Sequence, residues 1–145
     1  MNGENYLGKI QAMSRSMQNV VLLKGRKTFN DSEMRMIEEI VAADKKGEKL
    51  ISTELADKIG VTRSAISQMV NRLSRKGLVK RVPDEIDRKI AYVCLDGKAK
   101  ELYSAQRKRM GESVSKIMSE FSAEKLDELL RLADEFSNAV YRNVR

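Results

Sequence analysis

The sequence contains no histidine and no tryptophan, and it has one cysteine, Cys94, in 145 residues. Without histidine it lacks the commonest metal ligand and the commonest general base, so a transition-metal site would have to rest on carboxylates. A single cysteine excludes an intrachain disulfide and favours a reducing compartment. No apolar run approaches the roughly 18 residues that a membrane span needs, and the first residues lack the apolar core of a signal peptide. These absences predict a cytoplasmic protein without a metal or cofactor.

The chain also lacks the local motifs that mark many enzymes. It has no glycine-rich phosphate loop and no nucleophile elbow. With histidine absent, a catalytic site would depend on carboxylates or lysines, and no cluster of these stands out along the sequence. The sequence therefore does not predict an enzyme.

Positive charge is concentrated in one segment. The whole chain carries a formal charge of +7, and residues 58–89 hold nine lysines or arginines against three acidic residues. The remaining 19 basic and 18 acidic residues nearly cancel. Such placement predicts a local anionic partner rather than a general gain in solubility.

Apolar residues recur at steps of three and four along most of the chain, which predicts amphipathic helices. The predicted helices cover residues 6–23, 31–46, 53–59, 63–76, 97–121 and 123–143. Their predicted capping side chains are Asn30 with Glu33 in a capping box, Ser52 or Thr53, Thr62, and Ser122. Two β-prone runs, LVKRVP and IAYVCL, flank a polar connector and predict a β-hairpin. The run KLIS is a candidate short strand.

The apolar faces of these helices predict the core. The expected inward residues are Met34, Ile37, Ile40 and Val41, then Leu55, Ala56 and Ile59, then Ile66, Met69, Val70 and Leu73, and finally Leu126, Leu129, Leu130, Ala133, Phe136 and Val140. With no internal repeat or low-complexity linker, the chain reads as one domain over residues 1–145. Its predicted class is mainly α with a small β-hairpin.

The two short helices in the middle, joined by a tight turn at Gly60, have the size of a helix-turn-helix. On a helical wheel, the side of the second helix opposite its apolar stripe carries short polar groups, with arginine at each end and no acid. Such groups can meet base edges and phosphates. The predicted DNA-binding residues are Thr62, Arg63, Ser64, Ser67, Gln68, Asn71, Arg72 and Arg75. The alternative is a solvated basic helix without a partner.

The connector DEIDRK places charged side chains on a projecting hairpin beside that helix. Such a tip can enter the minor groove of DNA, whereas a purely structural hairpin more often turns on a short Asn-Gly pair. The predicted wing residues are Asp87, Arg88 and Lys89. Helix and hairpin together favour a DNA-reading surface over a merely solvated one.

The segment STELADKIGVTRSAISQMVNRLSRKGLVKRVPDEIDRKIAYVCLDGKA resembles the MarR family of bacterial winged-helix transcriptional regulators, and the resemblance extends over most of the chain. The family's LxxKGLVxR join is matched by Leu73, Lys76, Gly77, Leu78, Val79 and Arg81. Its wing is matched by Asp84, Asp87 and Arg88. Lys89 stands where arginine is usual, and Asp96 where threonine is usual. Because lysine is a poorer bidentate donor, Arg88 is the better candidate for the minor groove.

The resemblance implies a winged helix-turn-helix over about residues 30–96, flanked by long dimerisation helices over about residues 4–24 and 97–143. The implied partners are a second copy of the chain, in an obligate dimer, and a double-stranded DNA operator. The implied dimer-interface residues are Ile10, Met13, Met17, Leu126, Leu129, Ala133, Phe136 and Val140. Their spacing also fits an intramolecular core, although the terminal helices carry more apolar surface than so small a domain covers alone.

Members of the family mostly repress transcription, and many release DNA when a small aromatic or lipophilic effector binds between the dimer arms and the winged helix. Met34 and the methionines of the first helix could line such a pocket, or could simply be core. Some relatives sense zinc through histidine-rich sites, which this chain lacks. Others sense peroxide through a reactive cysteine near the N-terminus, whereas Cys94 is expected to be a buried structural thiol.

The predicted function is that of a dimeric, sequence-specific repressor of palindromic operators, with half-sites about one helical turn (~34 Å) apart. Two alternatives stay open. One is a nonspecific architectural DNA-binding protein, and the other is a winged-helix module that binds other proteins.

Overall fold

The structure, a computed structural model, describes residues 2–23, 25 and 27–144. Its contacts divide the chain into two units, one formed by residues 26–108 and the other by residues 1–25 with 109–145. Helix α5 (Gly97–Glu120) contributes to both. The prediction of a single domain over residues 1–145 stays a prediction, and its positions 1, 24, 26 and 145 lie outside the described residues.

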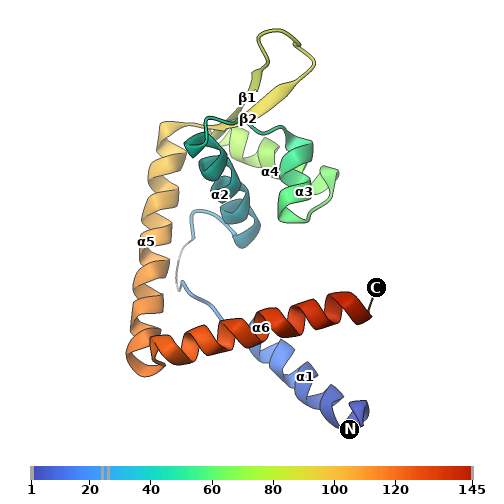
Figure 1. The fold of residues 1–145 in the computed structure, drawn as a ribbon. Helices are drawn as coiled ribbons and strands as arrows, with labels where there is room; N and C mark the ends of the chain where they lie inside the picture. Colours follow the sequence, from blue (N-terminus) through green and yellow to red (C-terminus); the bar gives the residue numbers. More distant parts are fainter. Residues whose placement is uncertain (1, 24, 26, 145) are drawn as a thin grey trace. The chain divides into compact units, whose positions relative to one another are not determined.

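The unit of residues 26–108 consists of helices with a two-stranded hairpin that projects from them (Figure 1). Its elements follow in the order α2 (Asp31–Lys45), α3 (Ser52–Ile59), α4 (Arg63–Arg75), β1 (Val79–Pro83), β2 (Ala91–Leu95) and the first part of α5. The predicted class, mainly α with a small β-hairpin wing, is confirmed.

Side-chain caps fix where the helices of this unit begin. The capping box before α2 is confirmed, because Asn30 Oδ1 accepts the Glu33 N–H at 2.8 Å and Glu33 Oε2 accepts the Asn30 N–H at 2.9 Å. Thr62 Oγ1 caps α4 by accepting the Ala65 N–H at 3.0 Å. The predicted cap of α3 at Ser52 or Thr53 is wrong. Ile51 occupies that position without an acceptor group, and its N–H instead donates to Glu54 Oε2 at 3.0 Å.

Gly60 ends α3 and makes the tight turn to α4, as predicted. Its backbone is left-handed, with φ 71° and ψ 37°, a conformation in which a Cβ would be strained. The next N–H, that of Val61, donates back to the Ala56 carbonyl at 3.0 Å. The turn therefore brings α4 against α3 within two residues.

The core of this unit is mostly the predicted one. All seven inward residues expected in α3 and α4 are buried: Leu55, Ala56, Ile59, Ile66, Met69, Val70 and Leu73. In α2, Ile37 and Ile40 are buried, but Met34 and Val41 are only half-buried and Met36 is fully buried. The buried stripe of α2 is therefore rotated from the predicted one and consists of Glu33, Met36, Ile37, Ile40 and Ala43.

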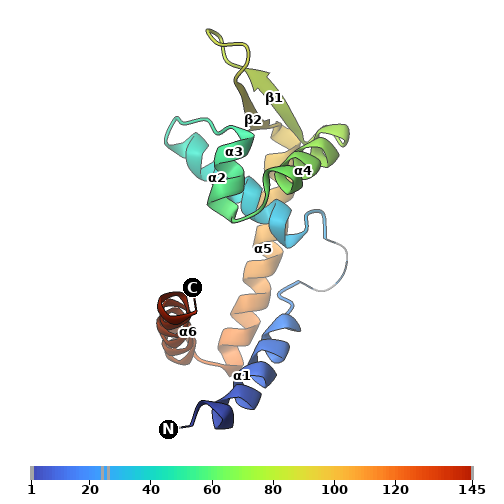
Figure 2. The ribbon, with the colours of Figure 1, turned by 90° about the vertical axis from the view of Figure 1, so that its right-hand side faces the viewer.

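Strands β1 and β2 pair antiparallel from Val79 opposite Leu95 to Pro83 opposite Ala91, beside α4 (Figure 2). Val93 and Leu95 of β2 face the core, so the intervening Cys94 points to the other face and is only half-buried. The expectation of a buried thiol is therefore wrong. The KLIS run forms one isolated bridge from Ile51 to Tyr92 rather than a named strand.

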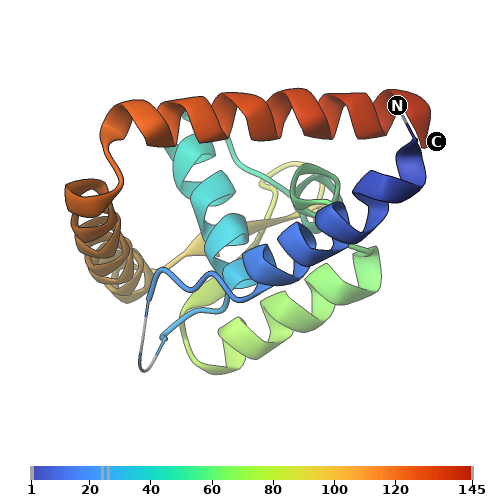
Figure 3. The ribbon, with the colours of Figure 1, turned by 90° about the horizontal axis from the view of Figure 1, so that it is seen from below.

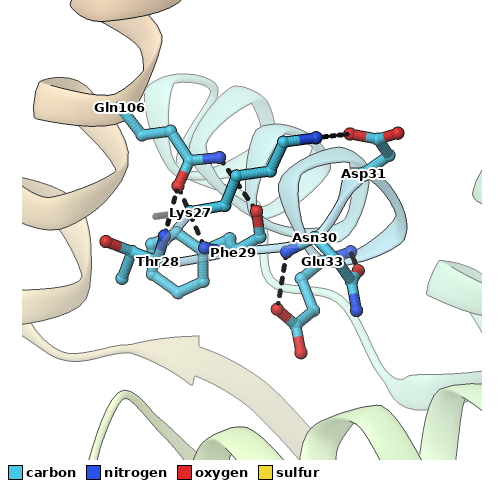
Figure 4. Close-up of polar contacts among 7 residues, drawn as sticks. All are labelled: Lys27, Thr28, Phe29, Asn30, Asp31, Glu33 and Gln106. Atoms are coloured by element: carbon cyan, nitrogen blue, oxygen red, sulfur yellow. Dashed lines mark hydrogen bonds and ion pairs between the residues drawn. The ribbon is translucent and has the colours of Figure 1, made fainter. Parts of the chain in front are cut away.

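One buried glutamine ties α5 to the segment before α2 (Figure 4). Gln106 is 2% exposed, and its Oε1 accepts the N–H groups of Thr28 at 3.0 Å and Phe29 at 2.9 Å. Its Nε2 donates to the Phe29 carbonyl at 2.9 Å. The Phe29 side chain is also fully buried. Phe29 is therefore held both by the hydrogen bonds of its backbone to Gln106 and by the apolar packing of its ring.

The second unit contains α1 (Gly3–Gln18), the end of α5 and α6 (Ala123–Asn143), the long helix seen along its length in Figure 3. Helix α1 stops earlier than the predicted end near Leu23, because Asn19 caps it and Val20 and Val21 follow outside it. The outer limit predicted for that helix, residue 24, lies outside the described residues. The Ser122 cap of α6 is confirmed, since Ser122 Oγ accepts the Lys125 N–H at 3.3 Å.

No described residue of α1 or α6 is buried in the single chain. The burial predicted for the apolar stripe of α6 is therefore wrong for one copy, with Leu129 46% and Phe136 43% exposed. The periodicity correctly predicted an apolar face but did not identify what covers it. Among the described residues, no helix is both long and apolar enough to cross a membrane.

We expect Gln106→Leu to destabilise the unit of residues 26–108 strongly. The change leaves three backbone groups without a partner, and at about 1–3 kcal/mol for each buried orphan the free energy of unfolding should fall by roughly 3 kcal/mol. Urea denaturation at fixed protein concentration measures this. Gln68→Leu, at an exposed position of α4, is the matched control and should change stability by less than about 0.5 kcal/mol. Equal midpoints for the two variants would contradict the role of Gln106.

Candidate nucleic-acid interface

Helix α4 presents a polar strip on the side opposite its core residues. Side chains three and four positions apart are neighbours on a helix, so these residues form a continuous surface. The recognition strip, as we name it, consists of Arg63, Ser64, Ser67, Gln68, Asn71 and Arg75. All are exposed except Ser67, which is half-buried. Helix α4 contains no acidic residue, so this surface suits an anionic partner.

Thr62 shapes the start of the strip. Its Oγ1 accepts the Ala65 N–H, which begins the helix at Arg63. No acid lies in the first turn to neutralise the positive end of the helix dipole. The N-terminus of α4 therefore adds to the electrostatic attraction for an anion.

Arg72 differs from the other predicted DNA contacts because its guanidinium is bound within the chain. Its Nε donates a hydrogen bond to Glu33 Oε1 at 2.9 Å, and its Nη2 forms an ion pair with the same oxygen at 2.9 Å. The Glu33 carboxylate is nearly buried, with 5% of its side chain exposed, and its other oxygen caps α2 (Figure 4). This pair attaches α4 to the first turn of α2, and it leaves Arg72 less free to reach a phosphate than Arg63 or Arg75.

Asn71, in the middle of the strip, is joined to strand β1. Its Oδ1 accepts a hydrogen bond from Arg81 Nη1 at 2.9 Å. The Asn71 backbone carbonyl also receives a long hydrogen bond of 3.4 Å from Arg75 Nε. The strip is thus connected to the base of the hairpin by an exposed arginine.

The hairpin tip is organised by one carboxylate. Asp84 accepts the N–H groups of Ile86 and Asp87 at 3.0 Å each, and the Tyr92 hydroxyl at 2.8 Å. The backbone closes the same turn, because the Asp84 N–H donates to the Ile90 carbonyl at 2.8 Å. The tip therefore has a defined shape before any partner binds.

These contacts shift the acidity of both side chains. The hydrogen bond from the Asp87 N–H is the main cause that lowers the pKa of Asp84 below its ordinary value of 3.8, followed by those from Tyr92 and Ile86. The same bond to the Asp84 carboxylate raises the pKa of Tyr92 above its ordinary value of 10.0. Both directions follow from hydrogen bonds that favour an ionised Asp84 and a protonated Tyr92.

The predicted wing residues lie together at this tip but differ in their contacts. Asp87 Oδ1 accepts the Lys89 N–H at 3.1 Å, so Asp87 shapes the turn. The side chains of Arg88 and Lys89 are exposed, and no acceptor within the described part of the chain holds them. Ile86, at 96% exposure, completes the outer surface of the tip.

A separate hollow of about 700 Å³ lies between α2 and α5 within the unit of residues 26–108. Val41 and Tyr103 line it, and two ion pairs border it, Lys100–Asp44 at 3.1 Å and Arg107–Glu38 at 2.7 Å. Met34, which was expected to line an effector pocket, does not line this one. In the described part of the chain, no three acidic or cysteine side chains are grouped as metal ligands.

Two functional relationships were not predicted from the sequence. Glu33 was assigned as a cap, but its bond to Arg72 joins residues 39 positions apart, which no local pattern reveals. Arg81 was noted only as part of a motif. Its position two residues from the start of β1, on an exposed face, is the one signal that could have suggested contact with the recognition strip.

A helix-turn-helix followed directly by a two-stranded hairpin defines a winged-helix protein. Comparison with known families agrees, since a model of the MarR family matches residues 28–90. This segment, which is less than half of the chain, is therefore similar to the MarR family.

Among curated proteins, the homoprotocatechuate degradative operon repressor of Escherichia coli is 29% identical over 83 residues. The match covers 57% of this chain and 56% of that protein, so the chain spans little more than half the length of this relative. The uncharacterised HTH-type transcriptional regulator YybA of Bacillus subtilis is 24% identical over 94 residues, covering 65% of this chain and 63% of that protein.

Among solved structures, the MarR family transcription regulator SP03579 has a TM-score of 0.81 at 14% identity. The match covers 97% of this chain and 93% of the chain of that structure. At this identity the likeness establishes the fold alone. It extends beyond the winged helix to nearly the whole chain.

We expect Arg72→Met to lower the free energy of unfolding by about 1–3 kcal/mol, because the buried Glu33 carboxylate loses its charged partner. The double variant Glu33→Gln/Arg72→Met should recover part of that loss, because a neutral amide needs no counter-charge, and the resulting coupling energy should reach at least about 0.5 kcal/mol. Chemical denaturation of the four proteins measures it. The control is Arg75→Met, and a loss no larger for Arg72→Met than for this control would exclude a stabilising pair.

We also expect the hairpin tip to keep its shape in acid. A carboxyl group whose pKa is lowered by folding contributes stability at every pH above its pKa in the unfolded chain. This contribution is lost only as the pH falls through its lowered pKa in the folded protein. The amide resonances of Ile86 and Asp87 should therefore stay nearly constant from pH 7 to pH 5 and move in a transition whose midpoint lies below pH 3.8. NMR titration reports this, with Asp84→Asn as the non-titrating control. A transition centred above pH 3.8 in the wild type would contradict it.

Proposed function

We propose that this chain is a sequence-specific DNA-binding repressor that acts as a dimer on a palindromic operator. The observation that carries the proposal is the acid-free recognition strip of α4 in the same unit as a preformed hairpin tip that exposes Arg88 and Lys89. The E. coli relative is by name a repressor, which supports the direction of control.

In this proposal α4 lies in the major groove. Gln68, Asn71 and the serines of the recognition strip meet donors and acceptors on base edges, and Arg63 and Arg75 at its ends bind base edges or phosphates. Thr62 contributes the start of the helix to a backbone phosphate. Arg72 is the least favourable of the predicted contacts, because Glu33 already holds its guanidinium.

The wing adds a second contact in the adjacent minor groove. Arg88 is the principal side chain there, with Lys89 on the neighbouring phosphates. Asp87 acts by holding the turn rather than by touching DNA, as its bond to the Lys89 N–H favours. A tip that is already ordered loses little conformational entropy when it binds.

The dimer accounts for the uncovered apolar faces of the second unit. Ile10, Met13 and Met17 of α1 are 39–56% exposed, and Leu129, Phe136 and Val140 of α6 are 40–46% exposed. Leu126 and Ala133 continue the stripe of α6. A second copy of the chain would cover these faces and set two α4 helices on half-sites about one DNA turn apart.

A small aromatic or lipophilic effector is the proposed release signal. The hollow between α2 and α5 is a candidate place for it, because Tyr103 and Val41 offer an apolar wall beside the ion pairs Lys100–Asp44 and Arg107–Glu38. Its volume of about 700 Å³ lies within the range of small-molecule sites.

Selection of bound sequences from a random DNA pool at physiological salt tests the proposal. We expect a palindromic motif with half-sites about 10 base pairs apart. Binding to it should be preferred over random DNA by at least about 10³-fold. Light scattering on the same sample should give twice the chain mass.

The alternatives have different outcomes. Binding without an enriched motif, which fades steeply as salt rises, would replace the proposal with a nonspecific architectural role. Absence of DNA binding by a folded dimer would favour a protein-interaction module. An enriched motif without two-fold symmetry would remove the palindrome and keep the specific reader.

A further inference from the structure

The two halves of helix α5 differ in how they are stabilised. In the first half Ala99, Tyr103 and Gln106 are buried, and Gln106 is bonded to the segment before α2. From residue 107 to residue 120, a stretch that the structure describes in full, no residue is buried in the single chain. Most helical stability in proteins comes from packing rather than from propensity. The second half therefore depends more on the helix-forming tendency of its own residues.

That tendency is low around Gly111. Inside a helix, glycine is less favourable than alanine by about fivefold in the equilibrium constant for helix formation. Two serines follow, and each returns a hydrogen bond to the turn before it. Ser113 Oγ donates to the Arg109 carbonyl at 3.2 Å, and Ser115 Oγ donates to the Gly111 carbonyl at 3.1 Å. Such bonds weaken a helix slightly and often bend it.

Nothing within the described part of the chain requires a glycine at position 111. A Cβ added there would meet no heavy atom within 4 Å outside its own helix, and the backbone is not left-handed. Two explanations remain, which are space for a second copy of the chain and compliance of the helix itself. The two serine bonds favour compliance, because the close approach of a partner does not need them and a helix that bends commonly contains both residue types.

The weak stretch lies where α5 passes from one unit to the other. The boundary between the units falls between residues 108 and 109. On one side Gln106 holds α5 in the winged-helix unit, and on the other side Ile117 is the first exposed large apolar residue of α5. Residues 107–116, which we name the linking segment, join these two parts over about 15 Å of helix.

We propose that the linking segment lets the dimer bind operators whose half-sites differ in spacing, and that Gly111 determines how far this tolerance extends. The inference rests on the proposed function, because it needs a dimer with one α4 on each half-site. One extra base pair between the half-sites separates them by about 3.4 Å more and rotates one against the other by about 35°. A stiff α5 would lose contacts on one half-site, whereas a helix that bends at Gly111 keeps both.

Hydrogen exchange of the DNA-free protein tests the segment itself. Amides of residues 107–116 should exchange faster than those of residues 101–106 in the same helix, because they open more easily. Gly111→Ala should slow them by up to about fivefold. Mass spectrometry of overlapping peptides measures both. Equal protection of the two parts of α5, or no change in Gly111→Ala, overturns the inference without reference to DNA.

The affinity for two operators tests the role in binding. One is the operator obtained by selection from the random pool, and the other has one base pair inserted at its centre. The insertion should weaken binding by Gly111→Ala about fivefold more than binding by the wild type. Ser115→Ala, which removes the bond onto the Gly111 carbonyl, should change the penalty in the same direction and by less.

Gly8→Ala is the matched control. Gly8 is also an exposed glycine inside a helix, and a Cβ added there would meet nothing within 4 Å. Helix α1 does not cross the boundary between the units. This variant therefore gains the same helical stability without stiffening the linking segment, and its insertion penalty should equal that of the wild type.

The outcomes separate the inference from the function. An insertion penalty in Gly111→Ala no larger than that in Gly8→Ala overturns the inference and leaves the specific dimeric reader in place. Loss of the dimer in Gly111→Ala, measured by light scattering, would assign the glycine to space for a second copy and also overturns it. A wild type that enriches no motif overturns both the inference and the proposed function.

Discussion

The carboxylate of Glu33 is the contact on which the position of the recognition helix depends. One of its oxygens accepts the Asn30 N–H and begins α2, and the other accepts a hydrogen bond from Arg72 Nε of α4 and pairs with Arg72 Nη2. The same nearly buried carboxylate therefore has two roles. It satisfies a backbone N–H at the N-terminus of α2, and it pairs with the positive charge of Arg72. Residues next to Asn30 are held in turn by Gln106, so α5, α2 and α4 are joined through a short series of polar contacts inside an apolar core.

Local patterns in the sequence predicted most of what is local in the fold. Asn30, Thr62 and Ser122 cap helices as predicted, because a cap is decided by residues within three or four positions. The seven core residues of α3 and α4 were likewise given by helical periodicity. The end of α1 was wrong, because the apolar pattern continues through Val20 and Val21 after the helix has stopped at Gln18. Apolar periodicity indicates which residues are suited to burial. It does not indicate where the backbone hydrogen bonds of the helix end.

The site was predictable as a list of residues but not as a set of contacts. The side chains of the recognition strip follow from the wheel of one helix. Whether such a side chain is free depends on partners far away in the sequence, as Arg72 with Glu33 and Asn71 with Arg81 illustrate. The same limit applies to α6, where the pattern identified an apolar face and could not distinguish a core from a surface that a second chain covers.

In the hairpin tip, the groups that hold the turn are different from the side chains that the turn exposes to a partner. The turn is held by the Asp84 side chain and by backbone groups, whereas Glu85, Ile86 and Arg88 contribute side chains that the turn does not use. Those three positions can therefore change without refolding the loop, as the variable positions of an antibody loop do on a constant framework. A lineage of such proteins could acquire new binding preferences at the wing one substitution at a time, provided that the carboxylate at position 84 and its hydroxyl partner at Tyr92 are kept.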